Sequence, residues 1–176
     1  LVGKKIIGIG KSNERHAEQR FFVDRPVAIQ KFFGSDHGVG GEGGQLSYLL
    51  PLPFFSKITA GMYQAQSHSE EEGHEEGHGV EYSGWLQNAR IWNSMAISDS
   101  QELQLGLNYL LGNATASSET DQQTIMGVDL TYSYQLNPVQ ALNIETEYYS
   151  VKYGEEGESP ETQTGGLVAL TYKWDK

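Results

Sequence analysis

Apolar and polar residues alternate along much of this 176-residue chain. In "ELQLGLNYL", residues 102–110, the apolar Leu103, Leu105 and Leu107 are separated by polar residues or glycine. The same period of two recurs at 126–134, 141–149 and 167–174. A period of two is typical of a β-strand with one buried face, because a helix would repeat about every 3.6 residues. The pattern therefore predicts half-buried antiparallel strands.

Less regular apolar runs bring the expected number of strands to about eight. They lie at 2–10, 45–50, 54–66 and 82–97. No window approaches the roughly 18 continuous apolar residues that a membrane-spanning helix needs. This excludes a helical membrane protein, but it leaves a barrel open, because barrel strands alternate apolar and polar residues.

The lengths of the connections between strands give the strongest signal. They run long (11–44), short (51–53), long (67–81), short (98–101), intermediate to long (113–121), short (137–140) and long (154–164). The alternation places short turns at one end of the sheet and long loops at the other, as in barrels of bacterial outer membranes. We therefore expect an all-β, antiparallel up-and-down meander that forms part of an outer-membrane β-barrel. Residues 1–176 would be a single, partial barrel domain.

A period of two does not reveal which face of a strand meets water. The open alternative is a water-soluble up-and-down barrel or sandwich, whose apolar face points inward. Aromatic residues near the expected strand ends favour the membrane, because outer-membrane barrels carry aromatic girdles at both interfaces. These residues are Tyr82, Trp85, Tyr109, Tyr132, Tyr134, Tyr153, Tyr172 and Trp174.

The first long connection, 11–44, is too long for a simple loop and is rich in Phe. "VAIQKFF" predicts a short helix, with Asp24 or Arg25 as its cap, Pro26 in its first turn and Gly34 at its end. We expect the connection to fold inward and narrow the lumen, facing acidic wall residues such as Glu145, Glu147 and Asp129. The residues of this expected constriction are Arg15, Arg20, Asp24, Arg25 and Lys31. The alternative is an external cap in which Asp24 and Arg25 only pair to hold the turn.

The segment "SHSEEEGHEEGHG", residues 67–79, combines three histidines with five glutamates. Neutral imidazole binds Zn²⁺ and other divalent transition metals, and carboxylates complete or orient such sites. The expected ligands are His68, His74, His78, Glu71, Glu72, Glu75 and Glu76. Gly73, Gly77 and Gly79 oppose a helix and predict an adaptable site of modest affinity. A purely solvated acidic loop is the alternative. In a barrel this loop, 67–81, would be extracellular.

Charge and composition limit the other classes. The net charge is −11, but residues 1–31 carry +4 and residues 32–176 carry −15, so no basic face for nucleic acid is expected. There is no Cys, which excludes thiolate zinc sites. Ser67, His68, Ser69, His16 and His37 form no recognisable nucleophile motif, and we expect no enzyme. The "GVGGEGG" segment, 38–44, lacks the Lys of a phosphate-binding loop and is expected to be a flexible return to the barrel.

Two stretches resemble a known family. "FFVDRPVAIQKFFG", 21–34, and "GEGGQLSYLLPLPFF", 41–55, resemble Gram-negative outer-membrane barrels of the porin-like or zinc-regulated outer-membrane receptor type. Residues 86–112 are similar to the barrel hairpins of the same group. Members of the family are longer, so the resemblance implies further strands upstream. A receptor would also have an upstream plug domain and an energy-coupling partner.

The expected function is an outer-membrane channel or receptor-type barrel for small solutes, with zinc or another divalent metal captured by the His/Glu-rich external loop. Outer-membrane lipid and small solutes or metal ions would be its partners, and no cofactor is required. One alternative is a general or anion-preferring porin with no specific metal role. The other is a soluble β-barrel metal-binding module.

Overall fold

A computed structural model describes residues 1–15, 26–34, 38–65, 80–116, 119–154 and 161–174 of the chain. Its eight strands form one sheet in the order β1 to β8, with each strand antiparallel to its sequence neighbours. The elements are β1 (Val2–Ile6), α1 (Gly10–Glu14), α2 (Val27–Phe33), β2 (Gly40–Leu49), β3 (Phe55–Ala65), β4 (Glu81–Ser98), β5 (Gln101–Ala116), β6 (Glu119–Asn137), β7 (Gln140–Tyr153) and β8 (Glu161–Trp174). The predicted all-β up-and-down meander of about eight strands is confirmed.

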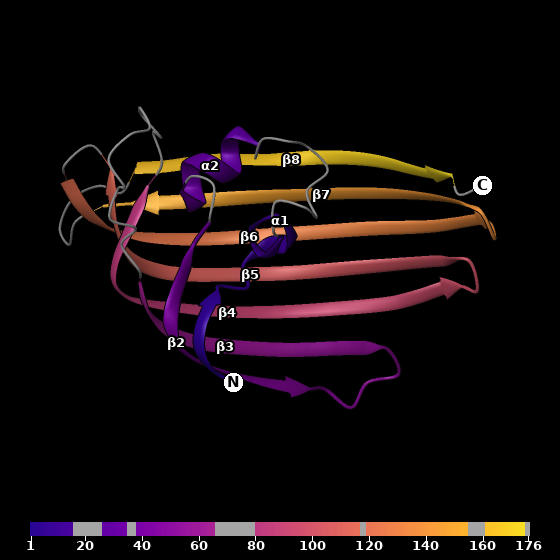
Figure 1. Ribbon diagram of the computed structural model, residues 1–176, viewed down its shortest axis with the longest axis horizontal. Helices are drawn as coiled ribbons and strands as arrows, with labels where there is room; N and C mark the ends of the chain where they lie inside the picture. The colour runs from indigo at the N-terminus through magenta and orange to yellow at the C-terminus, as the bar shows by residue number, and fades with distance from the viewer. Residues whose placement is uncertain (16–25, 35–37, 66–79, 117–118, 155–160, 175–176) are drawn as a thin grey trace.

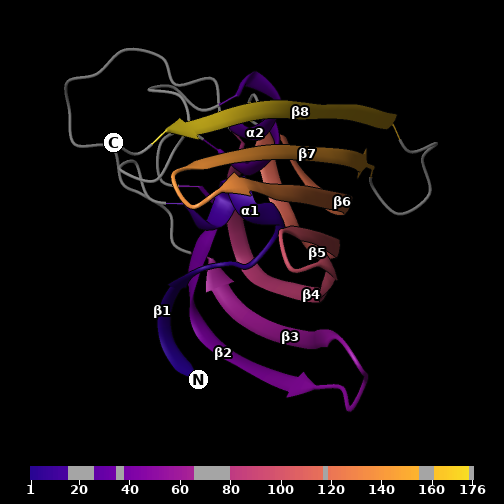
Figure 2. The ribbon, with the colours of Figure 1, turned by 90° about the vertical axis from the view of Figure 1, so that its right-hand side faces the viewer.

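The sheet is curved, and both helices lie on its concave side (Figure 2). The turns that follow β2, β4 and β6 lie together at one end of the long axis (Figure 1). The described ladders leave β1 and β8 at the two edges of the sheet. No helix in the described part of the chain is long and apolar enough to cross a membrane.

The predicted loop at 113–121 is wrong, because β5 and β6 continue through most of it. Their ladder runs from Gln101 paired with Tyr134 to Ala116 paired with Glu119, which leaves only residues 117 and 118 between the strands. The polar composition of this stretch suggested a loop. Backbone pairing in a hairpin does not require large apolar side chains, however, and it continues here past Leu111, the last of them in β5.

The prediction that residues 38–44 form a flexible return is also wrong, because Gly40–Gly44 belong to β2. β2 pairs with β1 on one side and β3 on the other. A Cβ on Gly41 would lie 2.5 Å from the Gln64 carbonyl oxygen, and one on Gly43 would lie 2.1 Å from that of Met62. The glycines therefore permit a close backbone approach that larger residues would prevent.

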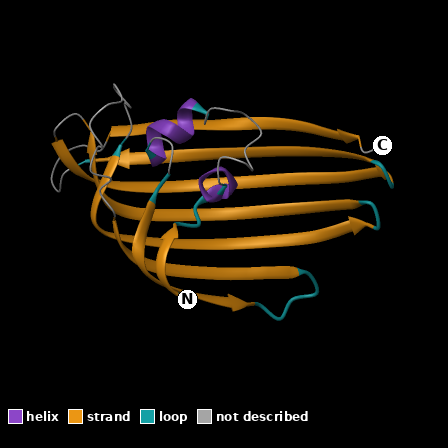
Figure 3. Cartoon of the chain, viewed as in Figure 1, coloured by secondary structure: helices purple, strands orange, loops and turns teal. Residues whose placement is uncertain are grey.

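The predicted helix at 27–33 is confirmed as α2, one of the two helices in Figure 3. Gly34 ends it with a positive φ of 79°. Pro26 is the cap residue rather than part of the first turn, and no side chain caps the helix. The expected caps, Asp24 and Arg25, lie outside the described residues. The five-residue helix α1 was not predicted, because glycine opens it and no apolar period marks it.

A cluster of apolar side chains holds the connection between β1 and β2 against the concave face. It contains Ile7, Ile9, Ile29, Phe32, Phe33, Val39, Tyr63, Tyr82, Leu86, Leu110, Ala114, Ile125, Tyr149 and Val151. Phe33 packs edge-to-face on Tyr149, with ring centroids 4.9 Å apart. The Tyr82 hydroxyl donates to the Phe32 carbonyl oxygen at 2.5 Å. Both contacts join α2 directly to strands of the sheet, β7 and β4.

Candidate functional site

The two faces of the sheet differ in chemistry. Along β6, Met126 and Val128 are exposed, whereas Ile125 and Asp129, which precede and follow them on the other face of the strand, are fully buried. The buried polar residues of the concave face include Asn88, Arg90, Asn108, Gln123, Asp129, Thr131, Glu145 and Glu147. The exposed hydrophobic residues of the convex face include Leu46, Tyr48, Ile58, Met62, Trp85, Ile91, Leu107, Met126, Val128, Tyr148, Val168, Leu170, Tyr172 and Trp174. The concave face thus holds the buried polar side chains beside the apolar cluster, whereas the convex face exposes apolar ones.

One row of directly paired residues crosses the convex face from β2 to β7. Its members are Tyr48, Ile58, Ile91, Leu107, Val128 and Tyr148. All six are between 37% and 64% exposed. With strands about 4.8 Å apart, this apolar belt runs for roughly 24 Å without a polar interruption. Tyr82 and Tyr153, expected in an aromatic girdle, lie instead in or against the concave apolar cluster.

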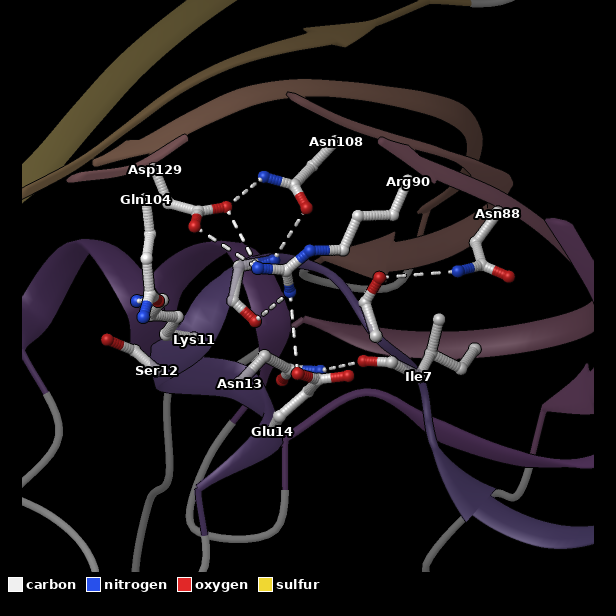
Figure 4. A network of polar contacts seen from close by, with 12 residues as sticks. Ile7, Lys11, Ser12, Asn13, Glu14, Asn88, Arg90, Gln104, Asn108 and Asp129 are labelled. Carbon is white, nitrogen blue, oxygen red and sulfur yellow. Dashed lines mark hydrogen bonds and ion pairs between the residues drawn. The ribbon is translucent and has the colours of Figure 1, made fainter. Parts of the chain in front are cut away.

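Arg90 of β4 is the centre of the polar network on the concave face (Figure 4). Its Nη2 donates to both carboxylate oxygens of Asp129, at 3.1 and 3.2 Å. Its Nη1 donates to the Gly10 carbonyl oxygen at 2.9 Å and lies 3.4 Å from Glu14 Oε2. Arg90 therefore links β4 and β6 to both ends of α1.

Two further wall residues complete this contact. Asn108 of β5 donates to Asp129 at 2.7 Å and accepts the backbone N–H of Gly10 at 3.0 Å. Gly106 leaves room for the Asp129 carboxylate, because a Cβ there would lie 2.1 Å from Asp129 Oδ2. The buried Asp129 charge is thus satisfied by an ion pair and an amide, as a buried carboxylate requires.

Glu147 of β7 receives the amino end of α1. Its Oε1 accepts the backbone N–H groups of Lys11 and Ser12 at 2.9 and 2.8 Å, and the Ser12 hydroxyl at 3.1 Å. Its Oε2 accepts the Tyr149 hydroxyl at 2.6 Å. The first N–H groups of a helix have no partner within the helix, and their partial positive charge favours a carboxylate. A wall residue therefore supplies the cap that the short helix lacks.

Arg15 and Lys11 carry the remaining charges of this segment. The Arg15 guanidinium contacts Glu145 at two points, 2.7 and 2.6 Å. The Lys11 ammonium donates to Gln104 at 2.5 Å and Thr131 at 2.6 Å. Burial lowers the pKa of Lys11 below its usual value, and the attraction of Glu145 and Asp129 opposes this effect. The segment thus presents Arg15 and Lys11 to acidic residues of the sheet.

The structure brings together only part of the expected constriction. Arg15 faces Glu145 of the acidic wall, as the sequence suggested, whereas Lys31 is exposed on α2. Arg20, Asp24 and Arg25 lie outside the described residues. The residues expected at the constriction did not include Arg90, although its position in the sequence is unusual. Arg90 is the sole Lys or Arg between Lys57 and Lys152, and it lies within the expected strand at 82–97.

The expected metal ligands lie outside the described residues. They are His68, His74, His78, Glu71, Glu72, Glu75 and Glu76. Across the described ranges, no group of three or more His, Cys, Asp or Glu side chains is placed to hold a metal ion. The zinc site stays a prediction from the sequence.

Comparison with protein-family models, with curated proteins and with solved structures finds no match. The resemblance to porin-like and zinc-regulated outer-membrane barrels therefore stays a prediction that rests on residues 21–34 and 41–55.

Proposed function

We propose that this chain forms part of the wall and lumen of an outer-membrane channel for small solutes. The observation that carries the proposal is the apolar belt from Tyr48 to Tyr148 on the convex face, opposite a charged and hydrogen-bonded concave face. Soluble proteins rarely expose contiguous apolar patches larger than a few hundred Å². Outer-membrane barrels require such a surface, because lipid meets the outside of the wall while the interior is polar.

The concave face supports a lumen. Glu145 and Asp129 form ion pairs there with Arg15 and Arg90, and Glu147 accepts hydrogen bonds from α1. Both helices lie within the concavity (Figure 2). In a closed barrel they would narrow the passage, and Arg15, Lys11 and Arg90 would set its local field. The constriction that we propose is formed by the described residues 7–15 and 26–34, which contain the two helices.

Metal capture is the second part of the proposal, and it rests on the sequence of residues 67–79. β3 ends at Ala65 and β4 begins at Glu81, at the end of the sheet opposite the turns that follow β2, β4 and β6. A His/Glu-rich segment there would stand at the external mouth. It would concentrate Zn²⁺ or a related cation, at modest affinity because of its glycines. A general porin without a metal role is the main alternative.

Detergent dependence tests the channel. The chain is unfolded in urea and diluted into plain buffer, into detergent micelles or into lipid vesicles. We expect sheet-rich circular dichroism and a heat-modifiable band on gels only with detergent or lipid, and stepwise conductance in planar bilayers. A monodisperse, folded protein in plain buffer would contradict the proposal and would favour the soluble metal-binding module.

A further inference from the structure

A cavity opens on the concave face beside Arg90, between β1, α1, β3 and β4. Its volume is ≈ 110 Å³. Four basic side chains from four different elements line it, together with one carboxylate: Lys5, Lys11, Lys57, Arg90 and Glu14. The polar Gln45 and Thr59 and the ring of Trp92 complete this lysine-rich cavity. A chain with a net charge of −11 thus concentrates cations at one internal point.

The cavity carries positive charge that the wall does not neutralise. The Asp129 carboxylate already accepts hydrogen bonds from Arg90 and Asn108, and Glu145 forms an ion pair with Arg15. Across the described residues, no carboxylate forms an ion pair with Lys5, Lys11 or Lys57. Their ammonium groups meet neutral partners instead. Lys5 Nζ donates to Gln45 Oε1 at 2.7 Å, and Lys57 Nζ stands 5.1 Å from the centre of the Trp92 ring.

Two neutral side chains that line the cavity, Gln45 and Trp92, also have N–H groups that can donate to a ligand. Gln45 Oε1 accepts from both Lys5 and the Tyr63 hydroxyl, which fixes the amide orientation and leaves its NH₂ group as a donor. Trp92 Nε1 is buried, and no acceptor for it occurs among the described residues. Buried donors normally have a partner, so an unmatched one beside a cavity suggests a missing acceptor. The lining therefore suits a ligand that is negative and accepts several hydrogen bonds.

We propose that this cavity binds a small tetrahedral oxyanion of the phosphate or sulfate class. Lysine is a common phosphate-binding residue, and charged hydrogen bonds are the strong ones. A water molecule needs roughly 10–15 Å³ by this measure of cavity volume, so the space holds several waters or one such ion. Glu14 is the one carboxylate of the lining, and it lowers the affinity. The proposal that the cavity binds an oxyanion depends only on these contacts. A role of the cavity in selecting anions for transport would depend also on the proposed channel.

Titration calorimetry with inorganic phosphate on the full chain in detergent micelles tests the site, at low ionic strength because salt screens the attraction. We expect one saturable site in the wild type. Lys5→Gln and Lys57→Gln should each weaken binding by about tenfold, and the double variant by about a hundredfold. Glu14→Gln should tighten binding severalfold. Lys4→Gln removes the same charge on the opposite face of β1 and should leave the dissociation constant unchanged. Sulfate in a parallel titration shows which oxyanion is preferred.

Two results would overturn the site: no saturable binding of either ion by folded wild type, or equal dissociation constants for wild type and both single lysine variants. Circular dichroism verifies the fold of each variant. Conductance in planar bilayers, measured on the same preparation, reports separately on the channel. Conductance without oxyanion binding contradicts the cavity alone, whereas binding without insertion contradicts the channel alone.

Discussion

Arg15 and Glu145 form a two-point ion pair across 130 residues of chain, with nitrogen–oxygen distances of 2.7 and 2.6 Å. Glu145 is almost fully buried, with a side chain 3% exposed, whereas the Arg15 side chain is 22% exposed. The pair fastens the connection between β1 and β2 to the wall. Its two members are therefore not equivalent, because only one of them would be left as a buried charge.

This asymmetry predicts different costs for the two truncations. Arg15→Ala leaves the Glu145 carboxylate buried and should lower the free energy of unfolding by about 1–3 kcal/mol, a value discounted for the partial exposure of Arg15. Glu145→Ala leaves an arginine that can reach water and should cost less. Urea unfolding in lipid vesicles measures both, and the double variant completes the cycle. Equal costs for the two single variants would contradict the assigned burial.

Gly10 should not tolerate a side chain. Its φ is +68°, and a Cβ there would lie 1.7 Å from the Tyr149 hydroxyl oxygen. We expect Gly10→Ala to destabilise the protein by roughly 2–4 kcal/mol, through backbone strain and through displacement of α1. Faster proteolysis of residues 7–39 would show the displacement. Gly44→Ala is the control, because a Cβ there has no neighbour closer than 3.6 Å. Equal stability of the two variants would argue against the seating of α1.

The apolar belt predicts which face rejects charge. Val128 lies at the midpoint of β6 on the convex face, and Val128→Arg should cost roughly 2–4 kcal/mol in lipid vesicles. Ser133→Arg, on the concave face of the same strand beside an open cavity of ≈ 350 Å³, should cost far less. In a water-soluble protein the order would reverse, since Val128 is already 43% exposed. Refolding yield and urea midpoints for the two variants distinguish these cases.

The external metal site predicts a specific effect of three histidines. Replacing His68, His74 and His78 together with Ala should lower Zn²⁺ affinity by at least about tenfold in calorimetry. Replacing His16 and His37, the other two histidines of the chain, should not. Metal needs neutral imidazole, with a reference pKa of about 6.5, so wild-type affinity should fall as the pH drops below roughly 6. Unchanged affinity in the triple variant would exclude the loop as the site.

The sequence was sufficient to predict the elements in which apolar and polar side chains follow a regular period. The strand around 102–110 and the helix ending at Gly34 follow from period, apolar content and a glycine stop. The sequence was insufficient where backbone pairing with a neighbouring strand determines the structure. Residues 113–116 contain no large apolar side chain yet remain in β5, because they pair with β6 in a hairpin. Gly41 and Gly43 are strand residues because β3 approaches them closely.

The polar network was largely beyond sequence reasoning. Arg90, Asn108 and Asp129 come together because register places three strands side by side, and no spacing in the chain encodes that register. The acidic side of the wall was visible as Glu145 and Glu147 on one face of an alternating stretch. The identity of what meets these acids, the backbone of a five-residue helix for Glu147, was not visible.

The capture of α1 by Glu147 has a consequence for the order of assembly. The donors, Lys11 and Ser12, precede their acceptor by 136 and 135 residues. Contacts of such sequence separation form late, because the intervening chain must first be ordered. The contacts of Glu147 with α1 are therefore expected to be among the last to form. Arg90 of β4 and Asn108 of β5 can hold Gly10 earlier, but Lys11 and Ser12 gain their acceptor only when β7 has paired. The amino end of α1 thus reaches its full set of contacts only when most of the sheet is built.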